Sequence, residues 1–275
     1  MRALRRLVWD LERFGVWPGK LAARFGKGRA SPSLAVSLPK AGTHLLERAL
    51  CLQRELYRPM VPTLNEINLA AHGGLEQVVQ GARCGQVFVA HLAHEPARAQ
   101  LLEAQGMRVF FLVRDPRDVV VSQAFYIARR RDHPLHRQFA ACPDLASRIR
   151  LAIDGDRSGG LPPVAERLDA YAGWLDERAV LVVRFEALIG SDPDVRDRCL
   201  GAIYDHLGLR VGPDQRGALA ARIVSDASPT FRQGRAGGWR HHFQGTDLAA
   251  YFAERVGPQL ERYGYRGEED HRYSR

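Results

Sequence analysis

Four short apolar runs, separated by stretches with helical character, most strongly limit what this chain can fold into. The runs occupy residues 34–38, 87–90, 109–113 and 180–185. Each has the length of one strand and is apolar at consecutive positions, as expected for a parallel sheet that is covered on both faces. Strands that alternate with helices form β–α–β units. The pattern therefore predicts an α/β fold of three layers, with a mostly parallel central sheet flanked by helices.

The predicted helices lie between and after these runs. Prolines at positions 96, 116, 163 and 193 suit the first turn of a helix, where the missing N–H has no partner to lose. We expect helices at residues 43–57, 96–105, 116–130, 163–178 and 193–207. Residues 154–163 contain three glycines and are expected to form a flexible surface loop.

The first 30 of the 275 residues differ from the rest, because basic residues interleave there with apolar ones. Leu4, Leu7 and Leu11 recur at helical spacing, so residues 1–14 are predicted to form a basic amphipathic helix. Such a helix either packs on its own domain or makes peripheral contact with an anionic membrane, here through residues 1–17. We therefore expect a basic N-terminal arm, residues 1–30, and one domain, residues 31–275.

The charge balance favours anionic partners. Forty Lys and Arg residues against 31 Asp and Glu give a net charge of +9, which attracts nucleotides, acidic glycans, nucleic acid or membrane without choosing among them. The four cysteines are scattered and are expected to be reduced thiols. Neither a membrane-spanning apolar run nor the pattern of a signal peptide is present, so we expect a cytoplasmic protein.

The first apolar run leads directly into the segment PKAGTH at residues 39–44 and then into a predicted helix. A strand, a loop of small residues and a helix N-terminus form an anion site, because unpaired N–H groups and the positive end of the helix dipole face the loop. Lys40 adds a charge, Gly42 permits close approach of the backbone to a ligand, and Thr43 can cap the helix or bind a phosphate. The segment is not a Walker A loop, since the lysine precedes the glycine. Taken alone, it also suits an ordinary strand–helix turn.

A second candidate anion site follows the third apolar run. Arg114 stands where the strand ends, which is the edge at which open α/β sheets bind ligands. Asp115 is expected to cap the next helix, with Pro116 at its first position. Ser122 lies almost two turns along that helix. An arginine and a hydroxyl can together hold a phosphate through charge-assisted hydrogen bonds.

These two segments resemble the donor-binding motifs of the PAPS-dependent sulfotransferase family. Residues 39–43 are similar to its loop P-K-S-G-T-T-W, with His44 and Leu45 in place of the second threonine and the tryptophan. Residues 114–122 are similar to R-N-P-x-D-V-x-x-S. A third segment, residues 232–243, is similar to the loop R-K-G-x-x-G-D-W-K-x-x-F that closes over the nucleotide, with Gln233 in place of the lysine. Taken alone, this third segment also suits a surface turn.

The resemblance implies a P-loop-like sulfotransferase fold and transfer of a sulfuryl group from 3′-phosphoadenosine 5′-phosphosulfate (PAPS) to a hydroxyl or amine of a small-molecule, lipid or carbohydrate acceptor. The product would be adenosine 3′,5′-bisphosphate (PAP), and no metal is expected. The resemblance assigns the phosphosulfate to Lys40, Ala41, Gly42, Thr43 and His44, and the 3′-phosphate to Arg114, Ser122, Arg232, Gln233 and Gly234.

Two groups are expected to be catalytic. Sulfuryl transfer has a loose transition state, so catalysis depends on alignment and on neutralising the leaving oxygen, a role that the resemblance gives to Lys40. The acceptor must also lose its proton to a base within hydrogen-bond reach. The family's segment K-T-H-L-P aligns its catalytic histidine with His91, which alternatively has a structural role. Glu66 and Glu95 are the lesser candidates for the base.

Two other functions stay open on the sequence. An ATP-dependent small-molecule kinase is disfavoured by the position of Lys40 and by the missing Ser/Thr–Mg²⁺ pattern. A non-catalytic basic module that binds nucleic acid or acidic glycan would show steep salt dependence, and we expect no nucleic-acid partner. Loops 58–86 and 129–163, where the resemblance fades, are expected to build the acceptor pocket. Arginines 129–131 either form a solvated charge run or meet an acidic acceptor.

Overall fold

A computed structural model describes residues 29–224 and 236–265, together with Asp10, Leu11 and Arg13. Five parallel strands form one sheet in the order β2-β3-β1-β4-β5. The strands are β1 (Ser33–Ser37), β2 (Leu64–Asn65), β3 (Val87–His91), β4 (Arg108–Val113) and β5 (Val180–Arg184). Four of them lie within one residue of the predicted apolar runs. The fifth, β2, is a two-residue edge strand that the sequence pattern did not indicate.

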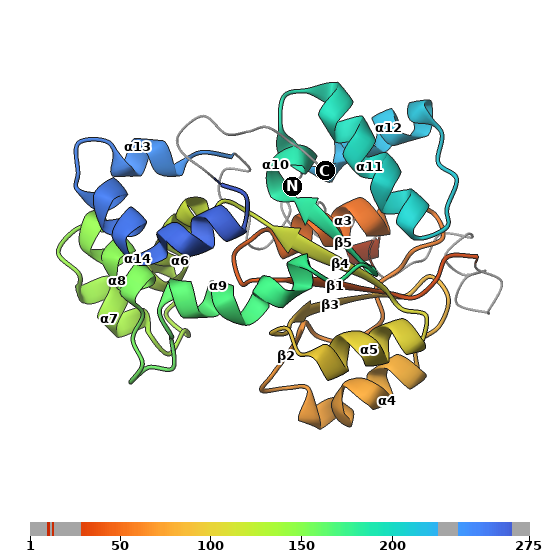
Figure 1. Ribbon diagram of the computed structural model, residues 1–275, viewed down its shortest axis with the longest axis horizontal. Coiled ribbons are helices and arrows are strands. Elements are labelled where there is room, and N and C mark those ends of the chain that lie inside the picture. Colours follow the sequence, from red (N-terminus) through yellow and green to blue (C-terminus); the bar gives the residue numbers. More distant parts are fainter. Residues whose placement is uncertain (1–9, 12, 14–28, 225–235, 266–275) are drawn as a thin grey trace.

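Helices cover both faces of the sheet, which confirms the predicted α/β fold of three layers (Figure 1). The helices are α3 (Thr43–Cys51), α4 (Gly74–Gln80), α5 (Pro96–Ala104), α6 (Pro116–Arg129), α7 (His136–Ala141), α8 (Leu145–Asp154), α9 (Val164–Ala172), α10 (Phe185–Ile189), α11 (Pro193–His206), α12 (Pro213–Ile223), α13 (Trp239–Phe243) and α14 (Leu248–Arg262), with 3-10 turns η2 (Ala70–His72) and η3 (Gly173–Leu175).

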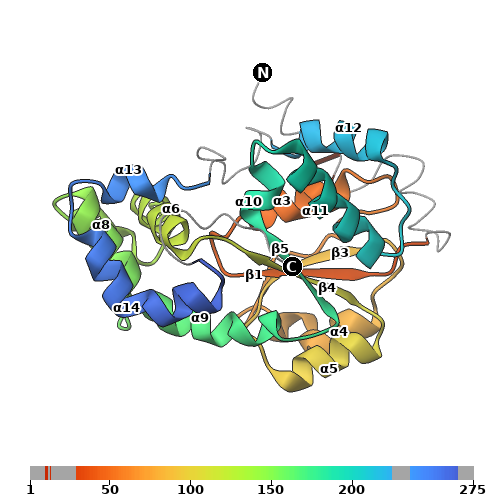
Figure 2. The same cartoon turned by 45° about the horizontal axis from the view of Figure 1, so that its top comes forward.

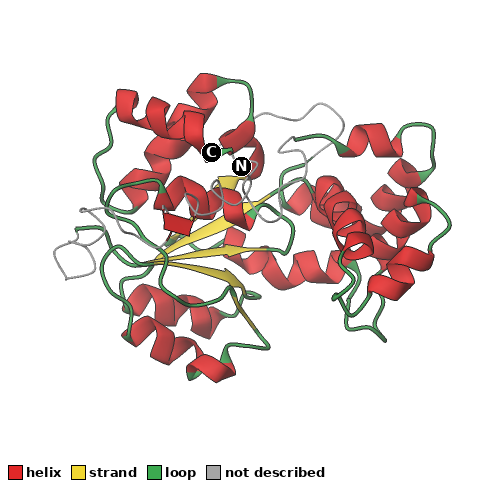
Figure 3. Ribbon diagram, turned by 180° about the vertical axis from the view of Figure 1, so that it is seen from behind, coloured by secondary structure: helices red, strands yellow, loops and turns green. Residues whose placement is uncertain are grey.

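The sheet separates two hydrophobic clusters, because successive strand residues point to opposite faces. Ala35, Phe110 and Leu112 pack with α3, α10, α11 and α12 on one face. Leu34, Val36 and their neighbours pack with α4 and α5 on the other face, in a cluster that continues into α6, α8, α9 and α14. Figures 2 and 3 show the strands between the two helical layers, with α6, α8, α13 and α14 gathered at one end of the sheet.

Two predicted helices are shorter than expected. The helix predicted at residues 43–57 ends at Cys51, because Tyr57 is hydrogen-bonded beside the sheet instead. The N–H of Tyr57 donates to Gly85 O (2.8 Å), and its carbonyl accepts from Val87 N (2.9 Å). The helix predicted at residues 163–178 ends at Ala172 and continues only as the turn η3. The predicted surface loop after α8 is closed by paired backbone hydrogen bonds between Asp156 and Leu161.

The strand order explains where a ligand can bind. Strand β1 is hydrogen-bonded to β3 on one side and to β4 on the other, all in parallel. After β1, the chain forms β2 and β3 on one side of that strand and then crosses to the other side to form β4. Ligands bind at the carboxyl edge beside such a switch point in open α/β sheets. The residues that follow these three strands must therefore lie side by side.

Among the described residues, no helix has the length and apolarity needed to cross a bilayer.

A fully buried carboxylate anchors α3, the helix that begins at the predicted anion loop. Glu47 accepts from Arg13 Nε (2.5 Å), lies 3.2 Å from Arg58 Nη1 and pairs with His44 Nδ1 (3.0 Å). The backbone N–H of Arg58 also donates to the carbonyl of Arg13 (2.8 Å). Arg13 belongs to the predicted N-terminal arm, which otherwise lies almost entirely outside the described residues. Arg13 thus fastens the described part of the arm to α3.

We predict that Glu47→Gln destabilises the protein by about 3–5 kcal/mol at neutral pH, because it leaves buried guanidinium groups without their counter-charge. Burial raises the pKa of Glu47, but the hydrogen bond with His44 and the charges of Arg58 and Arg13 outweigh it and bring the pKa to about 2. A depressed carboxyl pKa stabilises the fold above its unfolded value of 4.5, and this contribution is lost as the pH falls toward 2. Urea unfolding across this range should show the difference between wild type and variant shrinking with acid. Glu103→Gln, on the exposed surface of α5, is the matched control.

Candidate functional site

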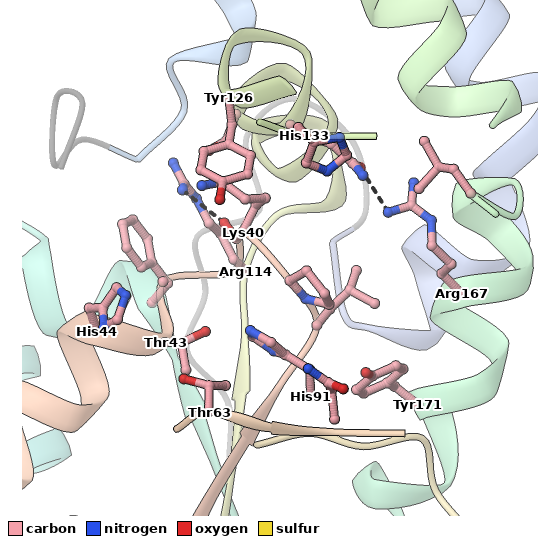
Figure 4. Close-up of a pocket in the computed structure, with 18 of the residues that line it drawn as sticks. Lys40, Thr43, His44, Thr63, His91, Arg114, Tyr126, His133, Arg167 and Tyr171 are labelled. Carbon is pink, nitrogen blue, oxygen red and sulfur yellow. Dashed lines mark hydrogen bonds between the residues drawn. The ribbon is translucent and has the colours of Figure 1, made fainter. Parts of the chain in front are cut away.

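A cavity of about 990 Å³ opens at the carboxyl edge of the sheet. Its walls come from the loop after β1, the ends of β3 and β4, one face of α6, and parts of α9, α10 and α12. Residues of loops 58–86 and 129–163, which the sequence left for an acceptor pocket, also line it. Figure 4 shows Lys40, Thr43, His44, His91 and Arg114 around this space. The cavity thus brings together predicted residues from three separate strands.

The loop after β1 has an unusual backbone. Lys40 has φ +74° and is the one non-glycine residue with positive φ in the described part of the chain, and Gly42 follows with φ +112°. A left-handed non-glycine residue stores about 1–3 kcal/mol of strain and tends to occur at functional sites. The hydroxyls of Thr43 and Ser37 lie 2.7 Å apart and fix the start of α3 to the end of β1. Gly42 is the N-cap of α3 and provides no side-chain cap, which leaves the first N–H groups of the helix to other acceptors.

Gly42 is required by packing as well as by backbone angle. A Cβ atom placed there would lie 2.4 Å from Cδ2 of Phe185, the first residue of α10. The same phenyl ring lies under the guanidinium of Arg114, 4.1 Å from the ring centroid to Cζ. The loop after β1, the end of β4 and the start of α10 are therefore packed against one another through one aromatic ring.

Arg114 connects the first two predicted phosphate segments. Its Nη1 donates to the carbonyl of Lys40 (3.4 Å), and its Nη2 lies 3.5 Å from Oδ2 of Asp118. Asp115 caps α6 by accepting from Arg117 N (2.9 Å), as predicted. Ser122, further along α6, lines the same cavity. The two segments therefore meet at one cavity and are joined by a hydrogen bond.

Asp118 attaches the third predicted segment to the second. This fully buried carboxylate accepts from Gly237 N (2.8 Å) and Trp239 N (2.9 Å). The guanidinium of Arg117 stacks over the indole of Trp239, 3.8 Å from its centroid. The predicted phosphate contacts Arg232, Gln233 and Gly234 lie outside the described residues. The described end of the same segment is held against α6, beside Arg114.

His91 is held in one tautomer. It ends β3, and its Nδ1 lies 2.8 Å from the carbonyl oxygen of Ser37 on the neighbouring strand. A carbonyl only accepts hydrogen bonds, so Nδ1 carries the proton and Nε2 keeps its lone pair. Burial lowers the pKa of His91, and the nearby charges of His44 and Lys40 lower it further, against the opposite effect of the Ser37 hydrogen bond. A neutral imidazole with a fixed acceptor nitrogen has the form that a general base needs.

The two lesser candidates for the base are engaged elsewhere. Glu66 lines the cavity but accepts from both terminal nitrogens of Arg98 (3.0 and 3.1 Å) and from Ala93 N (3.1 Å). Glu95 precedes α5 and lies 3.2 Å from the same Arg98. Both carboxylates are thus already engaged by the guanidinium of Arg98. His91 is therefore better arranged to accept a proton than either glutamate.

Sequence reasoning missed Tyr126 as a site residue. The Nζ of Lys40 lies 3.7 Å from the centroid of its ring, within the range of a cation–π contact. Tyr126 stands one helical turn beyond Ser122 on α6, so the helical spacing alone would have placed both on one face.

Within the described ranges, no group of three or more His, Cys, Asp or Glu side chains is arranged to hold a metal ion.

Comparison with known proteins adds to this geometry. No protein-family model matches the chain, and no curated protein matches it in sequence. Mouse sulfotransferase SULT7A1, solved in complex with PAP, matches in structure with a TM-score of 0.61 and 18% identity over 84% of this chain and 85% of that one. Retinol dehydratase, solved with retinol and PAP, matches with a TM-score of 0.55 and 15% identity over 87% of this chain and 84% of its own. The chain therefore has the sulfotransferase fold that the resemblance implied.

We predict that Gly42→Ala costs more than about 1 kcal/mol of stability, since both the positive φ and the contact with Phe185 oppose a methyl group. Phe185→Leu should relieve only part of this cost in a double-mutant cycle followed by urea unfolding. Gly217→Ala in α12, where a Cβ meets no atom within 4 Å, is the control and should be neutral or stabilising. Equal behaviour of the two alanine variants would contradict the role given to Gly42.

Proposed function

We propose that the protein transfers a sulfuryl group from PAPS to a hydroxyl or amine of a small-molecule, lipid or carbohydrate acceptor and releases PAP. The observation that carries the proposal is the convergence of Lys40, Arg114 and His91 on one cavity, each just after or at the end of adjacent strands. Their order and spacing match the motifs of sulfotransferases, and the chain has the fold of those enzymes. The PAP complexes of two proteins with this fold further support PAPS as the donor.

The donor's two charged ends would bind at the two ends of this arrangement. The loop of residues 39–44 would hold the 5′-phosphosulfate with backbone N–H groups at the start of α3 and with the Lys40 ammonium. Arg114 and Ser122 would hold the 3′-phosphate with help from residues 232–234. Leu45, Phe185 and Ile189 line the cavity beside the loop and would offer the adenine an apolar surface where the family has a tryptophan.

The chemistry needs little more than alignment and charge. The acceptor oxygen or nitrogen forms a bond to sulfur while the bond from sulfur to the bridging oxygen of the nucleotide breaks. Lys40 would stabilise the negative charge that stays on that leaving oxygen. Nε2 of His91 would accept the proton of the acceptor, since Nδ1 is occupied by the Ser37 carbonyl. No metal is required in this scheme.

The test is PAP binding by calorimetry together with single-turnover transfer from radiolabelled PAPS. Lys40→Ala should slow transfer by about 100-fold or more, because its charge acts mainly on the transition state. PAP affinity should fall far less, by under about tenfold. Arg108→Ala, at the amino end of β4 and the opposite edge of the sheet, is the control for loss of one charge.

Other outcomes would identify other functions. Equal losses of binding and turnover in Lys40→Ala would reject its transition-state role. Activity that requires ATP and magnesium, without response to PAPS, would make the protein a small-molecule kinase. Binding that falls steeply with salt and shows no preference for PAP would indicate a non-catalytic basic module.

The His91 assignment makes a separate prediction about pH. A base works when it is deprotonated, so activity is present above its pKa and is lost as the pH falls through it. The pKa of His91 lies below the usual 6.5. We therefore expect kcat/KM to be level at neutral pH and to fall only when the pH drops below 6.5. His91→Ala should lose this acid limb and turn over about 10²–10⁴ times more slowly, with PAP affinity nearly intact. A variant that transfers at the wild-type rate would show that another residue is the base.

The proposal also includes where the protein works. All four cysteines are free thiols, which supports a cytoplasmic location. Peripheral membrane contact through residues 1–17 stays a proposal, supported by their basic amphipathic pattern. Arg13, bound to Glu47, would hold such an arm beside the donor loop.

A further inference from the structure

Arg167 lies on α9 and lines the cavity on the side away from the donor loop. Its guanidinium is half-buried and donates to three neutral oxygens. These are the carbonyl of Pro162 (3.0 Å from Nε), the side-chain amide of Gln123 (2.8 Å from Nη1) and the carbonyl of Ala152 (3.0 Å from Nη2). Among the described residues, Arg167 forms no ion pair. Its position is therefore fixed by acceptors that leave its charge uncompensated.

Three arginines near the cavity differ in that respect, because each pairs with a carboxylate. Arg98 pairs with Glu66, Arg114 with Asp118, and Arg117 with Asp115. Glu66 is the one carboxylate among the described lining residues, and Arg98 already binds it. Burial lowers the pKa of Arg167 to about 10, which still leaves it charged at neutral pH. The cavity wall thus holds a fixed positive charge that no described carboxylate pairs with.

The position of Arg167 places this charge on the acceptor side of the cavity rather than on the donor side. In Figure 4, His91 lies between Thr43 and His44 of the donor loop on one side and Arg167 and Tyr171 of α9 on the other. The acceptor must reach His91 from the side opposite the donor, because the attacking and leaving atoms lie roughly in line. Tyr171 stands one helical turn after Arg167 and lines the same wall. The predicted charge run at residues 129–131, by contrast, is absent from the described lining residues.

We infer that the acceptor is a hydroxy-carboxylate whose carboxylate binds Arg167 while its hydroxyl reaches His91. This inference rests on the proposed function. A guanidinium has five N–H donors, and three are used by the neutral oxygens, so two remain for a ligand. Two such donors match the two oxygens of a carboxylate. Tyr126, Leu135 and Leu161 give the space between an apolar lining suited to an aromatic ring or an alkyl chain.

The experiment compares acceptors that differ only in charge. The probes are para-hydroxybenzoate, para-hydroxyphenylacetate and para-hydroxyphenylpropionate, together with an ω-hydroxyalkanoate, each paired with its neutral amide. Binding is measured by calorimetry with and without saturating PAP, and transfer is measured as kcat/KM with PAPS. We expect wild type to prefer at least one carboxylate over its amide by about 10- to 100-fold, the range of a charge-assisted hydrogen-bond pair.

Substitution of Arg167 should remove this preference and little else. In Arg167→Gln, the favoured carboxylate should fall to the level of its amide, while the amide and PAP bind within about twofold of wild type. Arg167→Lys, which keeps the charge without the planar fork, should retain part of the preference. Arg148→Gln is the matched control. Arg148 also donates to two carbonyl oxygens from a half-buried position, but it does not line the cavity. It should keep the full preference.

Two results would overturn the inference. One is a wild type that binds every carboxylate no better than its amide. The other is an equal loss for both members of a pair in Arg167→Gln, which would mean that Arg167 only braces α9 against α6 and α8. Thermal unfolding shows whether each variant is folded. If Arg167→Gln is not, Arg167→Lys is compared with wild type in its place. The proposed function is tested separately, because a wild-type protein that does not bind PAP would contradict it. The role of Arg167 can still be measured in that case, since carboxylate binding is also measured without nucleotide.

Discussion

The pairing of β1 with β3 on one side and β4 on the other is the constraint on which the site depends. It places Ser37, His91 and Arg114 side by side at one edge of the sheet, although they are far apart in sequence. Two hydrogen bonds then cross between the strand ends, from His91 to the carbonyl of Ser37 and from Arg114 to the carbonyl of Lys40. Another strand order would separate His91, the proposed base, from Lys40 and Arg114, the proposed phosphate-binding groups.

Two fully buried carboxylates complete this frame, and each binds backbone or side-chain donors from distant segments. Glu47 joins α3 to Arg13 and Arg58, and Asp118 joins α6 to the segment at Gly237. Burying a carboxylate is costly unless its oxygens are satisfied, and both are. Glu47 thus fixes the helix that begins at the donor loop, and Asp118 fixes the segment at Gly237 beside Arg114.

The sequence predicted the frame better than the details of the cavity. Four strand positions were predicted within one residue from local pattern. Lys40, His91 and Arg114 were expected at strand ends, and the structure places all three in one cavity. The two-residue strand β2 carries too little pattern to be seen. The close approach of Phe185 to Gly42 depends on how β5 lies beside β4, which is a long-range contact. The place of Arg167 in the cavity wall likewise depends on tertiary structure, which brings its three neutral acceptors together.

The surroundings of His91 would also allow one cavity to bind an anionic donor while the proposed base stays neutral. Burial is the main cause of the lowered pKa, and the positive charges of His44 and Lys40 act in the same direction. A bound anion near Lys40 would offset that charge and raise the proton affinity of His91. The base would thus become stronger only once the donor is in place. Coupling of this kind needs no movement of the protein, only the short distances that the β3-β1-β4 order imposes.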